Sequence, residues 1–215
     1  MNTLILSVPR SGSTYLYTIL YPLHDCVYSE PFRKVTDPTQ FVNTLPADNV
    51  LIKSHYRQLR WLGRPTHDRF MGRDWNIIML LRRNVFAMTI SRAMAIHTGE
   101  YKDFTYGQDD IFTLNIYDVI ALHADSLRFI ADLVDACLPT PTVLYYEDLT
   151  FDPVTDCTTM GLPATRSDVQ VDRLRSPGMH VVANLNILHD LCSEYMRTYS
   201  HPTIRYNHNM EITSI

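Results

Sequence analysis

The stretch that most constrains the fold is Thr3–Leu16, where an apolar run passes through a polar turn into a helical pattern. The run begins almost at the first residue and is interrupted by Pro9, and apolar residues return at helical spacing from Leu16 onward. This order predicts a buried strand that enters a helix through a tight turn. The first N–H groups of such a helix and the positive end of its dipole face the turn, which favours an oxyanion there.

The turn itself carries side chains that suit an anion. Arg10 supplies a fixed charge and a forked set of donors. Hydroxyl side chains surround Gly12, namely Ser11, Ser13 and Thr14. An ordinary strand-to-helix turn with Ser or Thr caps explains the same residues, so this pattern alone leaves both interpretations open.

The chain has 215 residues, of which 46% are hydrophobic and 20% charged, as is typical of a globular protein with one well-filled core. We therefore expect a single domain over residues 1–215. The four cysteines form no CxxC pair and no metal-ligand pattern, so we expect reduced thiols. The sequence shows neither a signal peptide nor an apolar run of membrane-spanning length. These features predict a cytoplasmic protein with no membrane partner; they do not indicate an oligomeric state.

The net charge of −4 means that polyanion binding would depend on local clusters of bases. Between Lys53 and Arg92 there are nine basic side chains and only two acidic ones, Asp68 and Asp74. A solvated basic face is the ordinary explanation of such a run. Because no aromatic-interleaved or DNA-reading motif accompanies the bases, we expect no nucleic-acid partner.

The remaining pattern alternates strands and helices. Besides the first strand, apolar or β-favouring segments predict four strands: Cys26–Ser29, Asn49–Ile52, Trp75–Leu81 and Thr142–Tyr146. Between and after them, periodicity and capping residues predict helices near residues 38–45, 84–97, 116–134 and 184–199, with short helix and loop over 56–73. We expect irregular structure from 150 to 183 and a polar tail after 199. This order predicts a doubly wound α/β fold, with a mainly parallel central sheet and helices on both faces.

In doubly wound sheets, ligands bind at the carboxyl ends of the strands. The predicted strand ends place five residues on one rim: Arg10, Glu30, Lys53, His55 and Arg83. We therefore expect the functional site at this edge.

Three segments together resemble the superfamily of sulfotransferases that use 3′-phosphoadenosine 5′-phosphosulfate. Pro9–Thr14 resembles the loop that holds the 5′-phosphosulfate, in the Arg form typical of carbohydrate and tyrosylprotein enzymes. Arg83-Asn84, followed by Ser91, resembles the 3′-phosphate site, and Tyr146-Glu147-Asp148-Leu149 resembles a segment that recurs in the same place. The resemblance implies a P-loop type of fold, this nucleotide as the sulfuryl donor, and a hydroxyl acceptor, with a carbohydrate or small molecule favoured.

The proposed 3′-phosphate site is consistent with helix geometry. Ser91 lies eight residues beyond Arg83, about two helical turns, so both side chains can reach one phosphate. Each charged hydrogen bond would contribute about 1.5–3 kcal/mol. The structural alternative is an Arg that caps a carbonyl and a Ser that bonds within its own helix. In related enzymes a C-terminal basic loop closes over this phosphate; Arg175 in Arg173–Gly178 is the candidate here, although the usual Arg-Lys-Gly arrangement is absent and a solvated loop explains it equally.

The residue that would take the acceptor's proton is either Glu30 or His55. Glu30-Pro31 resembles the Glu-Pro pair of carbohydrate enzymes, whereas Lys53-Ser54-His55 resembles the Lys-Thr-His of the cytosolic branch, whose His is the base. Because the Arg10 loop goes with the Glu branch, we favour Glu30 as the base, with His55 as a substrate contact or the base itself. Glu30 would need a raised pKa for this role, since an ordinary Glu titrates near 4.3 and an ordinary His near 6.5. Arg10 and Lys53 are the expected catalytic cations.

A P-loop nucleotide kinase is the competing enzyme class, and a noncatalytic adenine-nucleotide-binding protein is the competing binding class. A kinase needs a GxxxxGK[ST] turn, whose second Gly and Lys are missing, and an acid to hold Mg²⁺ where the Trp75–Leu81 strand instead ends in arginines. The nine histidines show no HxH or HExxH spacing. We therefore expect a metal-independent reaction and no metal site.

Overall fold

The computed structural model describes residues 1–99, 111–136, 138, 141–163 and 182–215. The described residues fall into two compact units. The first contains residues 1–81 and the described part of 132–171, and the second contains residues 82–131 and 172–215 within the same limits. The single domain expected from the sequence stays a prediction.

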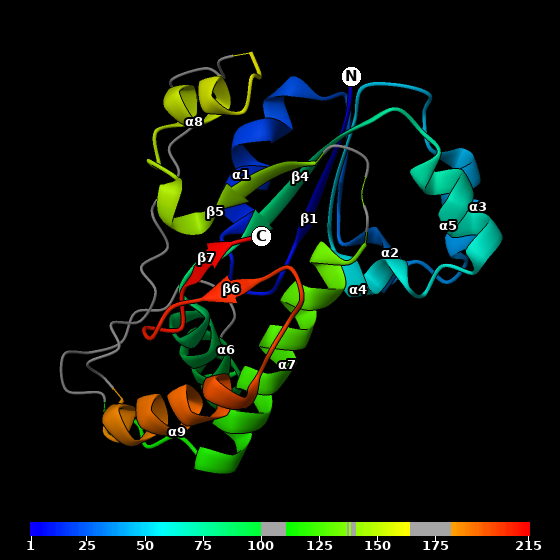
Figure 1. The fold of residues 1–215 in the computed structure, drawn as a ribbon. Helices are drawn as coiled ribbons and strands as arrows, with labels where there is room; N and C mark the ends of the chain where they lie inside the picture. Colours follow the sequence, from blue (N-terminus) through cyan, green and yellow to red (C-terminus); the bar gives the residue numbers. More distant parts are fainter. Residues whose placement is uncertain (100–110, 137, 139–140, 164–181) are drawn as a thin grey trace. The chain divides into compact units, whose positions relative to one another are not determined.

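The first unit is built on a five-stranded sheet with the strand order β2-β3-β1-β4-β5 (Figure 1). The strands are β1 (Asn2–Ser7), β2 (Cys26–Ser29), β3 (Val50–His55), β4 (Trp75–Leu81) and β5 (Thr142–Tyr145). Every neighbouring pair is parallel, and all six residues of β1 are buried. The five predicted strands and the parallel α/β class are therefore confirmed.

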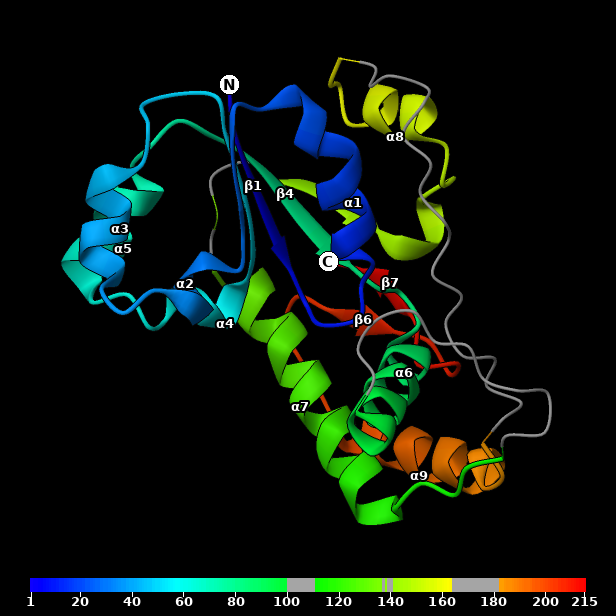
Figure 2. The same cartoon turned by 180° about the vertical axis from the view of Figure 1, so that it is seen from behind.

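One face of this sheet is covered by α1 (Ser13–Leu20), with α8 (Pro153–Thr159) beside it (Figure 2). Ile5 and Leu51 from the sheet, Leu16 from α1 and Cys157 from α8 belong to one buried cluster. Between the two helices, the hydroxyl of Tyr15 donates a hydrogen bond to the Asp156 carboxylate, at 2.5 Å.

The opposite face carries α2 (Pro31–Lys34), α3 (Pro38–Thr44) and α5 (Arg64–Met71). A chain of edge-to-face and tilted rings joins them to the sheet, with centroid distances of 5.1 Å for Tyr28 to Phe41, 5.6 Å for Phe41 to Phe32, 5.2 Å for Phe32 to Phe70 and 5.1 Å for Phe70 to Trp75. Because side chains alternate along a strand, Trp75 points away from the face occupied by Ile78, which packs under α1. Helices therefore cover both faces, as a doubly wound sheet requires.

The second unit is mainly helical. It contains α6 (Val85–Thr98), most of α7 (Ile116–Val134) and α9 (Leu185–Thr198), together with the small hairpin of β6 (Arg205–Tyr206) and β7 (Ile212–Ser214). Its core holds Phe86, Ile90 and Met94 from α6 with Leu188 and Cys192 from α9. The predicted helices near 84–97, 116–134 and 184–199 are confirmed.

Two expectations for the C-terminal part were wrong. The segment expected to be irregular contains α8, which begins with Pro153, where a missing N–H costs no helical hydrogen bond, and is capped by Asp152, whose carboxylate accepts from the N–H groups of Val154 and Thr155. The polar tail contains the β6–β7 hairpin, whose strands of two and three residues are too short to show alternation in the sequence.

Three further short elements complete the described chain: η1 (Tyr21–Leu23), α4 (Tyr56–Leu59) and η2 (Tyr146–Asp148). Cys26, Cys157 and Cys192 are free thiols, the last two buried. Among the described helices, none combines the length and the apolar composition needed to cross a membrane.

Candidate functional site

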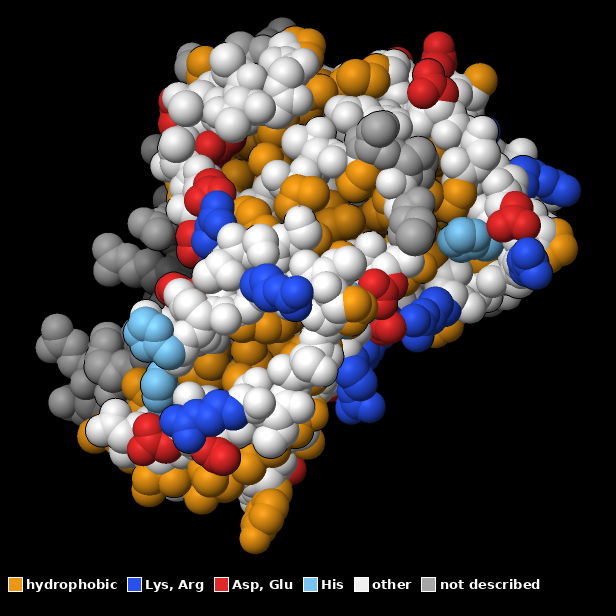
Figure 3. All heavy atoms as spheres, viewed as in Figure 1, with side chains coloured by type: hydrophobic (Ala, Val, Ile, Leu, Met, Phe, Trp, Pro, Cys, Tyr) orange, Lys and Arg blue, Asp and Glu red, His pale blue; other side chains and the backbone are white. Residues whose placement is uncertain are grey.

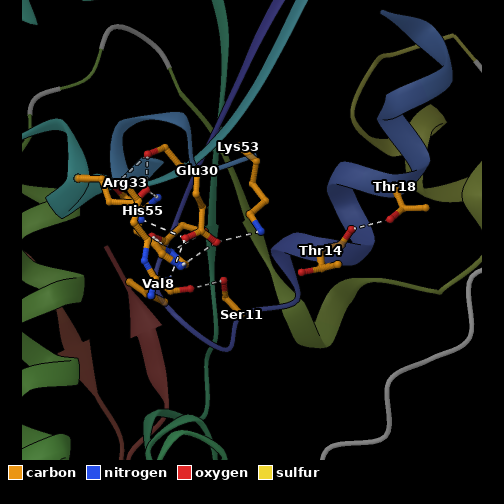
Figure 4. Close-up of polar contacts among 11 residues, drawn as sticks. Val8, Ser11, Thr14, Thr18, Glu30, Arg33, Lys53 and His55 are labelled. Carbon is orange, nitrogen blue, oxygen red and sulfur yellow. Dashed lines mark hydrogen bonds and ion pairs between the residues drawn. The ribbon is translucent and has the colours of Figure 1, made fainter. Parts of the chain in front are cut away.

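The turn between β1 and α1 has the form that the sequence predicts. Gly12 caps α1 with a φ of 80°, and Arg10 also lies in the left-handed region, with a φ of 66°. This conformation is uncommon for a residue with a Cβ and is found where the surrounding structure imposes it. Ser11 is completely buried, and its hydroxyl donates to the Val8 carbonyl at 2.8 Å (Figure 4), so it closes the turn. Thr14, in the first turn of α1, is exposed.

Two of the three segments that resemble sulfotransferases contact one another. Tyr146, the first residue after β5, packs its ring against the turn: a Cβ placed on Gly12 would lie 2.5 Å from the Cδ2 atom of that ring. The Tyr146 ring also contacts Phe151, which in turn contacts Tyr15 of α1. The segment that follows β5 therefore supports the turn directly.

Glu30, Lys53 and His55 converge at the carboxyl ends of β2 and β3 (Figure 4). The Glu30 Oε1 atom lies 3.3 Å from Lys53 Nζ and 3.8 Å from His55 Nε2. Glu30 follows β2 with a φ of 51°, and its N–H donates to the Lys53 carbonyl at 2.7 Å. The register pairs Ser29 with Lys53 and Ser7 with His55, so parallel pairing brings these residues together as predicted.

Lys53 is a buried cation, with 6% of its surface exposed. Its register partner on β1 is Ile5, which packs beneath α1, so the Lys53 side chain lies on the face that α1 covers. Figure 4 shows its ammonium group directed between Glu30 and the start of α1. A buried ammonium must be paired, and the Glu30 carboxylate provides that partner.

His55 is held by the backbone of β1. Its Nδ1 atom lies 3.2 Å from the carbonyl oxygen of Ser7. The Ser7 hydroxyl also lies 3.2 Å from Nδ1, and the His55 ring caps α4 by accepting from the Gln58 N–H, so these contacts hold the ring with Nε2 on the side of Glu30. Burial, with the positive charges of Lys53 and Arg33, lowers the pKa of His55 and outweighs the Glu30 carboxylate and the Ser7 carbonyl, which raise it, so the ring is neutral at pH 7.

The Glu30 carboxylate is held in its ionised form. Burial alone raises the pKa of Glu30, but the charge that His55 carries when it is protonated, the hydrogen bond from Gln58 and the Lys53 ammonium together outweigh it, and the net pKa is lowered. Arg33 adds a further cation 3.8 Å from Oε2. The raised pKa that the sequence hypothesis requires for Glu30 as a base is therefore not found.

Sequence reasoning missed Gln58, on α4, which has 6% of its surface exposed. Its Nε2 donates to Glu30 Oε2 at 3.1 Å, and its Oε1 accepts from the Ser54 hydroxyl at 2.8 Å and from the His55 N–H at 3.2 Å. The sequence predicts short helix and loop over 56–73 without clean periodicity, so neither the bounds of α4 nor the role of Gln58 could be read from it. The available signal was a Gln three residues after a potential N-cap, a spacing typical of helix starts.

The candidate 3′-phosphate residues belong to the second unit. Asn84 caps α6 as predicted, with its Oδ1 accepting from the Ala87 N–H at 2.7 Å. The C-terminal hairpin region secures this turn, because the Ile212 N–H donates to the Arg83 carbonyl at 3.0 Å. Ser91 lies in the second turn of α6 and is buried. Arg10, Glu30, Lys53 and His55 lie in the first unit, and Arg175 lies outside the described residues.

The basic residues after Lys53 are mostly paired within their own units. The partners are Asp132 for Arg57 and Arg60, Asp68 for Arg64, Asn43 for Arg69, the Leu45 and Pro46 carbonyls for Arg73, and Asp125 for Arg92. On the face drawn in Figure 3, basic and acidic side chains are interspersed. Most of these side chains are therefore held within the fold, Arg57, Arg60, Arg64 and Arg92 by carboxylates and Arg69 and Arg73 by neutral acceptors.

No protein-family model matches the chain, and no curated protein matches it significantly. In the part of the chain that the structure describes, no group of three or more His, Cys, Asp or Glu side chains is arranged to hold a metal ion. The function is therefore inferred from the geometry of the site.

Proposed function

We propose that the protein is a sulfotransferase that moves the sulfuryl group of 3′-phosphoadenosine 5′-phosphosulfate to an acceptor hydroxyl. The observation that carries this proposal is the convergence of Glu30, Lys53 and His55 at the strand ends, on the side of the sheet where α1 begins. In-line transfer needs a base for the acceptor proton, cations for the charge that grows on the leaving oxygen, and precise positioning. The three side chains, with the turn at Gly12, offer these functions.

The donor set of the turn fits the sulfated end of the nucleotide. Arg10, Lys53 and the N–H groups at the start of α1 are donors or cations, and Ser13 and Thr14 add hydroxyls. The donor supplies the sulfuryl group, whose bond to the 5′-phosphate breaks as the acceptor oxygen binds sulfur, leaving adenosine 3′,5′-bisphosphate. Arg83 and Ser91 are the proposed partners of the 3′-phosphate. Ser11 shapes the turn through its bond to Val8.

Between the two candidate bases, the protonation states favour His55. Its pKa is lowered mainly by burial, so the ring is neutral and a neutral imidazole can take the proton of the acceptor hydroxyl. Glu30 is ionised and engaged by Lys53, and it would stabilise the imidazolium that His55 becomes. Lys53 and Arg10 would oppose the charge on the leaving oxygen. Glu30 as the base is the alternative, which the resemblance of the Arg10 loop to the Glu branch favours.

The test is transfer of ³⁵S from the labelled donor to a panel of sugars, phenols and peptides, with EDTA present. We expect label on a hydroxyl acceptor, loss of transfer in Lys53→Met, and retained transfer in Lys34→Met, which changes an exposed lysine of α2. Label that never leaves the donor would refute the proposal. Mg²⁺-dependent transfer of the γ-phosphate of ATP would identify a kinase instead.

A further inference from the structure

One buried amide connects the groups of the candidate site. Gln58 contacts the Glu30 carboxylate through Nε2, and it contacts the Ser54 hydroxyl and the His55 N–H through Oε1. These contacts join the end of β3 to the residue that follows β2.

The orientation of the amide is fixed by its partners. Oε1 faces two groups that donate, so it must be the oxygen, and the NH₂ group must face Glu30. The short helix α4 is itself held on both sides of Gln58: Arg57 Nε lies 2.9 Å and Arg60 Nη2 2.7 Å from the carboxylate of Asp132. Gln58 is therefore a rigid donor rather than an adaptable one.

The hydrogen bond from Gln58 fixes the orientation of the Glu30 carboxylate. Gln58 occupies Oε2, which leaves Oε1 to face Lys53 and His55. The charged or titratable groups around Glu30 are Lys53 and His55 from β3 and Arg33 from α2. Without the Gln58 bond, the carboxylate is free to rotate toward Arg33 and away from His55.

We propose that Gln58 is a positioning residue, which locks the Glu30 carboxylate against His55 and Lys53 so that His55, and not Glu30, takes the proton of the acceptor. The role in proton transfer rests on the proposed function. The locking of the carboxylate does not, because it is a property of the free protein.

The experiment uses Gln58→Met, which keeps the length of the side chain and removes its hydrogen bonds, and Gln58→Glu, which keeps an acceptor for Ser54 and His55 but sets a second carboxylate against Glu30. Gln40→Met, an exposed glutamine of α3, is the control. Titration of the Glu30 carboxyl by ¹³C NMR in the free protein should show a raised pKa in Gln58→Met and a higher one in Gln58→Glu, because two adjacent carboxylates share a proton. In turnover, Gln58→Met should lower kcat roughly 10- to 100-fold with little change in KM. The control should change neither readout.

An unchanged Glu30 titration in both Gln58 variants would overturn the locking, whatever the activity. A shifted titration with an unchanged kcat would overturn the role in proton transfer. If the titration shifts and the wild-type protein transfers no sulfuryl group, the locking is upheld and the proposed function fails.

Discussion

Replacing Gly12 by alanine tests how the turn before α1 is built. Gly12 has a φ of 80°, and a Cβ there would lie 2.5 Å and 2.9 Å from two ring carbons of Tyr146. The left-handed backbone costs a residue with a Cβ about 1–2 kcal/mol. Displacing the packed ring costs about 1–3 kcal/mol more. We therefore expect Gly12→Ala to lower the free energy of unfolding by about 2–5 kcal/mol.

Two other variants separate these costs. Gly161 also has a positive φ, 67°, but no described atom lies within 4 Å of a Cβ placed there, so Gly161→Ala should show the backbone cost alone. In the Tyr146→Ala background, Gly12→Ala should lose its packing cost and approach the effect of Gly161→Ala. Urea denaturation followed by circular dichroism measures the wild type, the three single variants Gly12→Ala, Gly161→Ala and Tyr146→Ala, and the Gly12→Ala/Tyr146→Ala double variant. Equal losses at Gly12 and Gly161, or no coupling between Gly12 and Tyr146, would refute the contact.

Three further predictions concern the two units separately. His55→Asn should lower kcat by about 10²–10⁴-fold, the usual contribution of a general base, and more than Glu30→Gln does; full rate in both variants would contradict the mechanism. Arg83→Ala should weaken binding of adenosine 3′,5′-bisphosphate by about 1.5–3 kcal/mol and leave an analogue without the 3′-phosphate nearly unchanged, whereas equal losses in calorimetry would exclude that role. Burial lowers the pKa of His123 from 6.5 to about 4, so between these pH values the unfolded chain binds a proton that the folded protein does not bind. The neutral ring therefore contributes about 3 kcal/mol to the free energy of unfolding above pH 6.5, and this contribution is lost as the pH falls toward 4. Thermal unfolding across this range should show a flatter pH dependence in His123→Phe, and an identical slope would disprove the assignment.

The sequence predicted the sheet because its signals are local. Five apolar runs mark the strands, and the rule that parallel strands present their carboxyl ends at one edge was enough to bring Glu30, Lys53 and His55 together. The turn at Gly12 and the cap at Asn84 are also local signals, and both have the predicted form.

The parts that could not be predicted depend on partners far apart in the chain. Arg57 and Asp132 are 75 residues apart, so the sequence displays a run of charge but not its compensation. Gly12 follows β1 and Tyr146 follows β5, the first and last strands of the sheet along the chain, so their contact is not visible in the sequence. The protonation of Glu30 depends on burial and on the Gln58 amide, neither of which is visible before the fold is known.

The central claim is that the chain binds a nucleotide that carries an anion at each end. Isothermal titration calorimetry of the purified chain with adenosine 3′,5′-bisphosphate and with AMP tests it most directly. A 3′-phosphate held by a charged hydrogen bond contributes about 1.5–3 kcal/mol, so the bisphosphate should bind roughly 10- to 150-fold more tightly. Equal affinity for the two nucleotides, or no binding of either, would contradict the account.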